Sequence, residues 1–434
     1  MELGALLVMT NPLLEAFGNA ETNLNKNSSR FGKFTQIHVS KGGAILGASI
    51  QTYLLESTRV VVHADRNCNY HIFYQLVLGM PTSDRAKCSL EGDPDKYTYL
   101  RNATGKATAR RGGDPSEFKT SLEVLNKIGV SGAMVQSLWE TLSGLLTLGN
   151  ITYTENPNGD AAIADLKSLE LASKLLGCHQ ALLTQGLTSR TMKLKGTEMQ
   201  IPLKLDEAGS SRDALAKAVY GKLFIWIVTQ INTALIDKTV DLADTGFLGI
   251  LDIYGFENFE KNSLEQLLIN FTNEQLHQHF AVSLFKTEQE IYAAEGIVWP
   301  GIEWEDNTGC LEMICGKGPS VFNQVTEHSR LPKSTDEDMT EKLLNDHRKN
   351  KYMSPPKMGG KGRGGIARLT TKEAFVITHF AGQVMYQTAG WLKKNTDNLH
   401  EDLQLCMSSS TSPILAQIFS VGSINAITGG ARGG

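Results

Sequence analysis

Apolar and polar residues alternate from Phe34 to Val39, a period of two that is typical of a β-strand with one buried face. The run Arg59–His63 is β-branched and predicts a second strand. The uninterrupted apolar run Phe247–Leu251 predicts a third strand, suited to burial on both faces of a sheet. Three strands are therefore expected, far apart in the sequence.

Helical periodicity dominates the rest of the chain. Apolar residues recur at helical spacing between Val135 and Leu146, just before Gly149. The sequence Ser263-Leu264-Glu265-Gln266 fits a capping box, and neither Gly nor Pro occurs from Phe256 to Glu295, so a long helix is expected to begin at Ser263. The apolar stripe along this helix is, taken alone, typical of core packing. The predicted fold class is α/β, rich in helix.

Composition narrows the class of protein. The 434 residues are 41% hydrophobic and 20% charged, which excludes a disordered or rod-like molecule. The net charge of −4 gives no general attraction to nucleic acid or to anionic membranes. The apolar opening of the chain is expected to end at Asn11-Pro12, too short to span a membrane, so we expect no direct membrane insertion.

Cysteine usage points to a reduced compartment. The six cysteines are scattered, with no CxxC pair, which disfavours both a zinc scaffold and a disulfide scaffold. Glycine is concentrated at Gly359–Gly365 and Gly429–Gly434, where flexible segments are expected. These features favour a folded cytosolic protein with a disordered tail.

Two short segments carry candidate chemistry. Asp252 follows the apolar strand and Gly255 comes three positions later in the turn, an arrangement in which a carboxylate can hold Mg²⁺ while a glycine amide approaches a γ-phosphate. Residues 25–33 are rich in amide, hydroxyl and cationic groups, which suit phosphate oxygens and Mg²⁺. Each segment alone also has a simpler interpretation. The segment that begins at Asp252 fits a strand leading through a turn into a helix, and residues 25–33 fit a polar turn with a helix cap. Their occurrence together favours a nucleotide site.

Together with other motifs, these segments resemble a myosin motor (head) domain. Residues 25–33, Asn-Lys-Asn-Ser-Ser-Arg-Phe-Gly-Lys, are similar to its switch I, and residues 252–257, Asp-Ile-Tyr-Gly-Phe-Glu, to its switch II. The helix from Ser263 resembles the relay helix. Kinesins also use two switch segments, but the kinesin sequences of both motifs differ from these. Further matches occur in order at residues 11–20, 52–56, 70–76, 212–217 and 379–384.

The resemblance implies ATP and Mg²⁺ as cofactors. It implies that Ser29 ligates Mg²⁺ and that Asp252 holds the ion from its outer shell, while Asn25, Asn27 and Ser28 contact the phosphates or the attacking water. It also implies that Gly255 bonds the γ-phosphate, and that Arg30 and Glu257 form an ion pair that closes the switches. The expected catalytic residues are Ser28, Arg30, Gly255 and Glu257.

One motif that the resemblance requires is missing from these 434 residues. No Gly-x-x-x-x-Gly-Lys-[Ser/Thr] phosphate loop occurs in the sequence. The expected fold is therefore a P-loop-NTPase-like myosin head core, truncated at both ends, with a partial central sheet, many surrounding helices and an unpaired apolar edge at Phe247–Leu251. The isolated chain is expected to turn over little ATP, which leaves two hypotheses open: an actin-based ATPase motor, and a non-catalytic actin-binding fragment.

The resemblance also implies a domain order and partners. Residues 1–245 correspond to an upper region with switch I and an actin-contacting loop, residues 246–420 to a lower region with switch II, the relay helix and an actin-binding helix-turn-helix, and residues 421–434 to the Gly-rich tail. Actin filaments are the expected partner, and the expected location is the cytoplasmic cytoskeleton, in a myosin complex. Light chains are not expected to bind, since we find no IQ pattern.

The actin-binding surface is expected at Ser334–Lys351. The basic stretch that follows suits acidic actin, although without the resemblance a solvated flexible loop is the preferred interpretation. Thr197, in a loop resembling the cardiomyopathy loop, is a candidate phosphorylation site. The expected actin-binding residues are Thr335, Met339, Leu343, Leu344, Arg348, Lys349 and Lys351, followed by the basic residues Lys357, Lys361, Arg363 and Arg368.

Overall fold

The structure is a computed structural model that describes residues 3–23, 25–64, 66–102, 104–107, 115–194, 197–236, 245–298, 306–331, 333–356, 369–396 and 399–420. Its contacts divide the chain into two compact units. The first unit comprises Met1–Ile253 and Asn398–Gly434, and the second comprises Tyr254–Asp397. The described residues 399–420, near the end of the chain, thus belong to the first unit. The expected tail, 421–434, lies outside the described residues.

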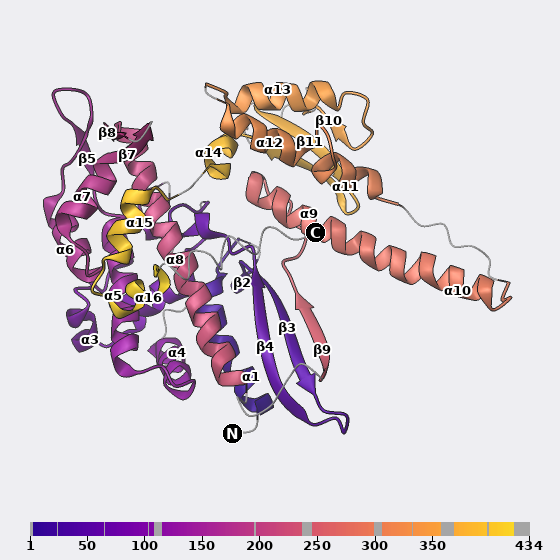
Figure 1. Cartoon of the computed structure of the whole chain (residues 1–434), viewed down its shortest axis with the longest axis horizontal. Helices are drawn as coiled ribbons and strands as arrows, with labels where there is room; N and C mark the ends of the chain where they lie inside the picture. The colour runs from indigo at the N-terminus through magenta and orange to yellow at the C-terminus, as the bar shows by residue number, and fades with distance from the viewer. Residues whose placement is uncertain are drawn as a thin grey trace. The chain divides into compact units, whose positions relative to one another are not determined.

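The first unit contains a three-stranded antiparallel sheet in the order β4-β3-β9 (Figure 1). The central strand is β3 (Gly32–Val39), which confirms the strand predicted there. Its neighbours are β4 (Ile45–Tyr53), which the sequence analysis missed, and β9 (Gly246–Asp252).

The strand expected at Arg59–His63 is wrong. Residues Ser57–Val60 form a 3₁₀ turn instead. Arg59 is buried there, and its guanidinium donates to Glu56, three residues earlier, and to the carbonyl of Cys68. The first of these contacts joins two residues three positions apart, which a tight turn brings together and an extended strand keeps apart. The β-branched pattern is therefore overridden by a buried polar contact.

Strand β9 is apolar but not buried. Leu248 and Ile250 are 59% and 50% exposed, and Phe247 and Leu251 are also exposed. Since successive strand side chains point to opposite faces, both faces of β9 are open, which corrects the expected burial. Among the described residues β9 pairs with β3 alone, so the predicted unpaired apolar edge is present.

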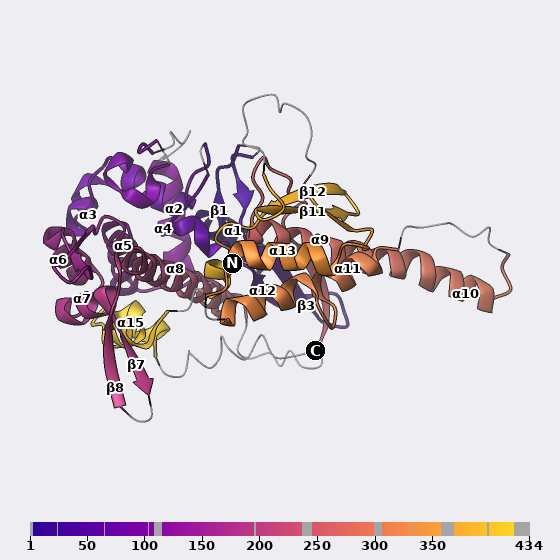
Figure 2. The same ribbon diagram turned by 90° about the horizontal axis from the view of Figure 1, so that it is seen from above.

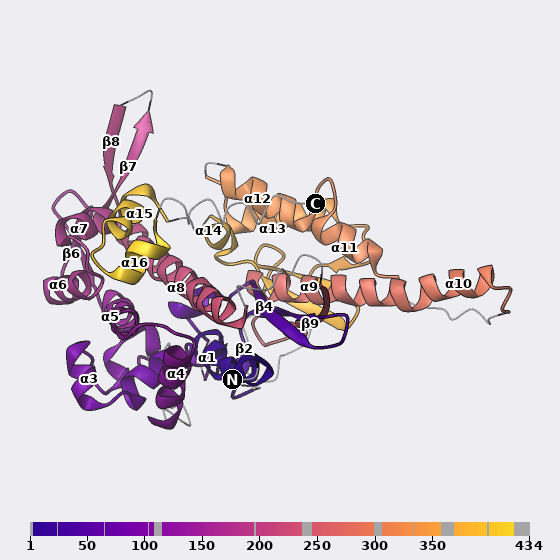
Figure 3. The ribbon, with the colours of Figure 1, turned by 60° about the horizontal axis from the view of Figure 1, so that its bottom comes forward.

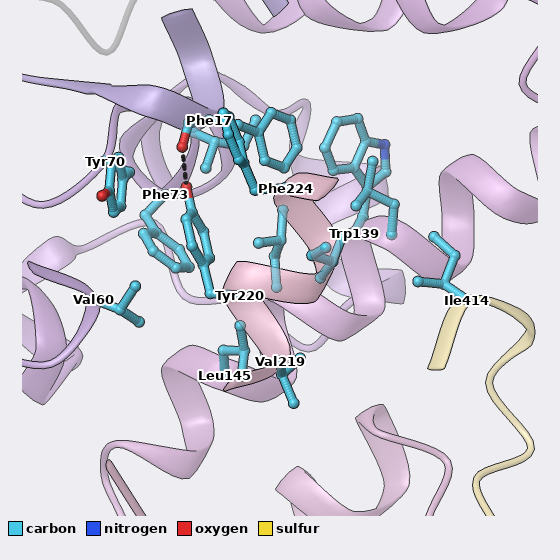
Figure 4. Close-up of a cluster of buried hydrophobic side chains, with 14 of the residues drawn as sticks. Phe17, Val60, Tyr70, Phe73, Trp139, Leu145, Val219, Tyr220, Phe224 and Ile414 are labelled. Carbon is cyan, nitrogen blue, oxygen red and sulfur yellow. Dashed lines mark hydrogen bonds between the residues drawn. The ribbon is translucent and has the colours of Figure 1, made fainter. Parts of the chain in front are cut away.

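A long buried helix, α8 (Leu205–Leu235), organises the core of the first unit. Figure 4 shows Tyr220 of α8 donating a hydrogen bond to the carbonyl of Phe17 at 2.8 Å, and the Tyr220 ring stacks on Tyr70 with centroids 4.9 Å apart. By length and composition α8 could cross a membrane, but 61% of its apolar window is buried within the protein, as in the core helix of a globular domain.

Helix α1 (Leu3–Gly18) contains Pro12, so the expected end of the segment at Asn11-Pro12 is wrong. A proline inside a helix costs about 3 kcal/mol. Leu13, Leu14 and Phe17 are fully buried beyond it, and each such side chain contributes about 1.5–3 kcal/mol. Core packing after the proline therefore outweighs its cost.

Helices from distant parts of the sequence surround α8. The returning segment forms α15 (Glu401–Ser408) and α16 (Pro413–Ile418), which lie beside α7 (Gln180–Thr188) and α5 (Gly132–Leu148) (Figure 3). Helix α5 confirms the helix predicted before Gly149. The remaining elements of this unit are β1 (Asn19–Ala20), β2 (Ser28–Ser29), α2 (His71–Tyr74), a π turn (Gln75–Gly79), α3 (Thr82–Lys87), 3₁₀ turns (Pro94–Lys96, Thr98–Leu100), α4 (Pro115–Lys127), β5 (Tyr153–Glu155), β6 (Ala161–Ile163), α6 (Leu166–Leu175), β7 (Ser189–Leu194) and β8 (Thr197–Pro202).

The second unit is built on α9 (Leu264–Ala281), whose predicted capping box at Ser263 is confirmed. This helix continues through a π-helical turn (Val282–Thr287) into α10 (Glu288–Ala294). A small antiparallel sheet, in the order β10-β11-β12, packs in the same core. The other elements of the unit are α11 (Thr308–Cys315), α12 (Val321–Arg330), α13 (Asp336–Asp346), β10 (Met353–Ser354), β11 (Ala374–His379), β12 (Gly382–Gln387) and α14 (Trp391–Asn395).

Candidate nucleotide site

The switch I-like segment, residues 25–33, connects α1 to the central strand. Within it, β2 pairs antiparallel with β1, and the amide of Arg30 donates to the carbonyl of Gly18 at 2.8 Å. The chain then enters β3 at Gly32. The segment is thus fixed at both ends by backbone pairing.

Asn27 anchors this segment to two helices. Its side-chain oxygen lies 3.1 Å from Asn19 Nδ2 and 2.9 Å from His71 Nε2, and its amide donates to Glu15 at 3.0 Å. These contacts occupy both ends of the side chain, so the geometry gives Asn27 a positioning role, and its expected nucleotide contact stays a prediction. Asn25 is exposed, and its side-chain oxygen accepts from the amide of Asn27 at 2.9 Å.

The two serines lie next to a buried arginine. Ser29 is half-buried, and its hydroxyl donates to the carbonyl of Phe31 at 2.9 Å. Ser28 accepts a hydrogen bond from Arg30 Nη1 at 3.1 Å. The Arg30 side chain is 1% exposed, which places a permanent positive charge inside the unit directly behind the serines.

Glu56 neutralises this buried charge together with a second arginine. Its Oε2 lies 2.6 Å from Arg30 Nε and 2.7 Å from Arg59 Nε. Burial alone would raise the pKa of Glu56, but the two guanidinium groups outweigh burial and lower the pKa to about 2. The sequence analysis matched residues 52–56 to the family but missed the role of Glu56 and Arg59, because nothing local marks them as partners of Arg30.

The second carboxylate of the candidate site stands at the end of β9. Register places Asp252 opposite Lys33, and Asp252 Oδ2 lies 3.5 Å from Lys33 Nζ. Asp252 is 61% exposed. Since β3 begins at Gly32 and the antiparallel strand β9 ends at Asp252, Asp252 lies at the end of this sheet where the chain enters β3 just after the serine pair. Hydroxyl and carboxylate oxygens are the donors that Mg²⁺ prefers, so these residues fit the ion.

Gly255 and Glu257 belong to the second unit. Gly255 is exposed, and a Cβ placed on it would meet nothing within 4 Å. The backbone of Glu257 exchanges two hydrogen bonds of 2.8 Å with the side chain of Asn270, and its Oε2 accepts from Gln266 at 3.2 Å. Helix α9 therefore holds the end of the switch II-like segment.

A cavity of about 440 Å³ lies behind the switch I-like segment, within the first unit. The sequence analysis did not anticipate it, because its lining comes from three helices, a π turn and a loop. Its wall combines acidic and basic groups. The lining residues are Pro12, Glu15, Ala16, Lys26, Asn27, His71, Gln75, Ser116, Glu117 and Thr120.

The expected actin surface needs correction. Met339 and Leu343 are fully buried in the core of the second unit, so their expected place on a contact surface is wrong. The helix pair is α12 and α13, and Ser334–Lys351 covers the second helix alone. Thr335 is exposed and caps α13 by accepting from the amide of Asp338. Leu344 is half-buried, and Arg348, Lys349 and Lys351 are exposed.

The remaining expected basic residues, Lys357, Lys361, Arg363 and Arg368, lie outside the described residues. Thr197 is described and exposed. It is the first residue of β8, opposite Leu194 in a hairpin that Figure 2 shows extending away from the helices of its unit.

Comparison with known proteins identifies the family. The family model described as Myosin head (motor domain) matches residues 1–431. The chain is 41% identical over 417 residues to Myosin-1 of Arabidopsis thaliana, covering 95% of this chain and 34% of the relative. It is 38% identical to Unconventional myosin heavy chain 6 of Caenorhabditis elegans, covering 94% and 19%, and 37% identical to Myosin-I heavy chain of Dictyostelium discoideum, covering 95% and 17%. The chain thus spans between about a sixth and a third of the length of these relatives, and it belongs to the myosin head (motor domain) family.

Proposed function

We propose that this chain serves in an actin-based motor that couples ATP hydrolysis to binding of actin filaments in the cytoplasmic cytoskeleton. The observation that carries the proposal is the register that pairs Asp252 with Lys33, four residues after Ser29. Membership of the myosin family supports it. The comparisons give no support to the alternative of a non-catalytic actin-binding fragment.

In this proposal Ser29 and Asp252 hold Mg²⁺, which neutralises charge on the phosphates. Asn25 and Ser28 orient phosphate oxygens or the attacking water, with Asn27 fixing the loop that carries them. Gly255 offers its amide to the γ-phosphate, because it has no Cβ to prevent a close approach. Together these groups contribute positioning and charge stabilisation.

Arg30 and Glu257 are proposed to pair when the switches close. In the structure Arg30 already shares the Glu56 carboxylate with Arg59. Glu56 therefore holds the guanidinium in position in advance, so that forming the latch requires little reorganisation of Arg30. Glu56 is a positioning residue for this ion pair.

Actin binding is proposed for the exposed residues around α13. Thr335, Leu344, Arg348, Lys349 and Lys351 remain as candidates. The cationic side chains suit an acidic filament. Thr197 is a proposed phosphorylation site, where phosphate would add negative charge to the tip of an exposed hairpin.

The test is actin-activated ATP hydrolysis by the protein at its natural length. Ser29→Ala and Asp252→Asn are each expected to lower the hydrolysis rate by about 10²-fold or more, as loss of a preorganised charge-stabilising group does. Ser83→Ala, at an exposed serine of α3, is the matched control and should leave the rate unchanged. Wild-type rates in both site variants would overturn the proposal. Binding to actin without any ATP turnover would support the non-catalytic alternative instead.

A further inference from the structure

Three side chains of metal-binding type meet inside the second unit. Glu274 comes from α9, Cys310 from the first turns of α11, and His379 from the last position of β11. All three are buried, and their ligand atoms lie within 4.8 Å of one another. A carboxylate oxygen, a thiol sulfur and an imidazole nitrogen form a donor set that suits Zn²⁺. Spacing along the sequence gave no sign of this cluster.

Neighbouring residues orient the imidazole. His379 Nδ1 lies 2.8 Å from Glu274 Oε2, and His379 Nε2 lies 2.8 Å from the hydroxyl of Tyr386. Asn270, one turn before Glu274 on α9, donates to the same hydroxyl at 2.9 Å. Histidine ligands of metals are held in this way, by a partner on the second ring nitrogen that fixes the ring and its tautomer.

A buried acceptor beside the cluster lacks a partner. Asn307 is 4% exposed, and its amide nitrogen donates to Glu274. Its oxygen Oδ1 is buried without a hydrogen-bond partner among the described residues. Buried polar atoms are normally satisfied, so an unused oxygen next to a carboxylate indicates a place for a positively charged ligand.

A cavity of about 450 Å³ reaches the cluster. Its lining includes Glu274, Asn307 and His379, together with His277 and Phe380, whose rings stack 4.3 Å apart. A metal ion therefore has a path inward and room for a fourth ligand, either Asn307 Oδ1 or a water molecule.

We propose that Glu274, Cys310 and His379 bind Zn²⁺, which clamps α9 to α11 and β11. Binding releases the Cys310 thiol proton to solvent and forms a Zn–S bond. The imidazole would bind the metal through Nδ1 and carry its proton on Nε2, which then donates a hydrogen bond to the Tyr386 hydroxyl. Tetrahedral coordination requires the most distant ligand atoms to approach by about 1 Å. Because Asn270 also bonds the backbone of Glu257, the clamp would stiffen the helix that holds the switch II-like segment.

The test uses the complete 434-residue chain, stripped of metal and titrated with Co²⁺ as a spectroscopic probe and then with Zn²⁺. We expect the intense visible absorption of tetrahedral Co²⁺ and a thiolate-to-cobalt charge-transfer band, both displaced by Zn²⁺. Cys310→Ala should abolish the charge-transfer band. Cys315→Ala, at an exposed cysteine of the same helix, is the matched control and should retain it.

A second variant separates metal binding from a purely structural role. Tyr386→Phe keeps all three ligands but removes the partner of Nε2, so we expect the band to remain while Co²⁺ affinity falls by about tenfold or more. If Cys310→Ala does not fold, Glu274→Gln takes its place, with an expected affinity loss of about tenfold or more. Absence of the band in the wild-type chain, its persistence in Cys310→Ala, or unchanged affinity in Tyr386→Phe and Glu274→Gln would overturn the proposal.

Discussion

Two carboxylates, the half-buried Glu56 in the first unit and the fully buried Glu274 in the second, are stabilised in opposite ways. Glu56 lies between two guanidinium groups, at 2.6 Å and 2.7 Å. Glu274 accepts from the ring of His379, the amide of Asn307 and the backbone N–H of Phe380, none of which carries a permanent charge.

The difference determines what each centre can do. The charge of Glu56 is already more than balanced, so its pKa falls to about 2 and the residue acts as a fixed component that positions Arg30. Glu274 is held by dipoles, with a thiol and an unused amide oxygen beside it. The first centre has no need of a further cation, whereas the second has ligands for one.

Removing the charge of Glu56 should have the largest effect. Glu56→Gln leaves Arg30 and Arg59 in a buried region without their shared carboxylate, and breaking such a buried pair costs about 3–5 kcal/mol. Hydrogen exchange of the β3 amides, followed by mass spectrometry, measures this loss within the first unit.

Glu155→Gln is the matched control for this change. Glu155 is an exposed residue of β5, so the same substitution there should alter stability by less than about 0.5 kcal/mol. Equal effects at Glu56 and Glu155 would show that the Glu56 carboxylate does not hold the two arginines.

The pH dependence of the free energy of unfolding should also reveal the contribution of Glu56. We expect this effect to be slightly smaller than that of the substitution itself. The folded pKa of Glu56 is lowered from 4.5 to about 2, so its contribution to stability is present above pH 4.5 and is lost as pH falls toward 2. The full contribution is about 3 kcal/mol, from 1.36 kcal/mol per pKa unit. The difference in unfolding free energy between the wild-type chain and Glu56→Gln, from urea denaturation, should stay constant above about pH 5 and shrink below it.

If the difference in unfolding free energy between the two proteins stays constant down to the pH at which both unfold, the lowered pKa of Glu56 is contradicted. Other carboxylates titrate in the same range. Taking the difference between the two proteins cancels their contributions, since both chains carry them.

Local patterns predicted the elements that local forces determine. The strand at Phe34–Val39 and the helix beginning at Ser263 follow from alternation and from a capping box. The turn at Ser57–Val60 and the continuation of α1 through Pro12 depend on buried contacts that no short window of sequence contains.

In the candidate sites, too, local sequence motifs could be recognised, whereas features that depend on the folded structure could not. Residues of the switch-like segments could be proposed because their motifs are continuous in sequence, and the register of β3 with β9 pairs Lys33 of the first segment with Asp252 of the second. Met339 and Leu343 were misplaced because an apolar residue on a short helix can face either a partner or the core. Glu274, Cys310 and His379 were missed because folding alone brings them together.

The smallest expected effect tests the hydrogen bonds around Glu274 without metal. Tyr386→Phe removes the hydroxyl that meets His379 Nε2 and Asn270 Nδ2, and a buried partner left unsatisfied costs about 1–3 kcal/mol. Tyr153→Phe is the control, because the buried Tyr153 hydroxyl has no partner among the described residues. Its removal should change stability by less than about 0.5 kcal/mol or increase it. Hydrogen exchange of the β12 and β5 amides measures the two losses separately. Equal losses would mean that the Tyr386 hydroxyl contributes through packing, and the contrast between a charge-balanced and a dipole-held carboxylate would then rest on Glu56 alone.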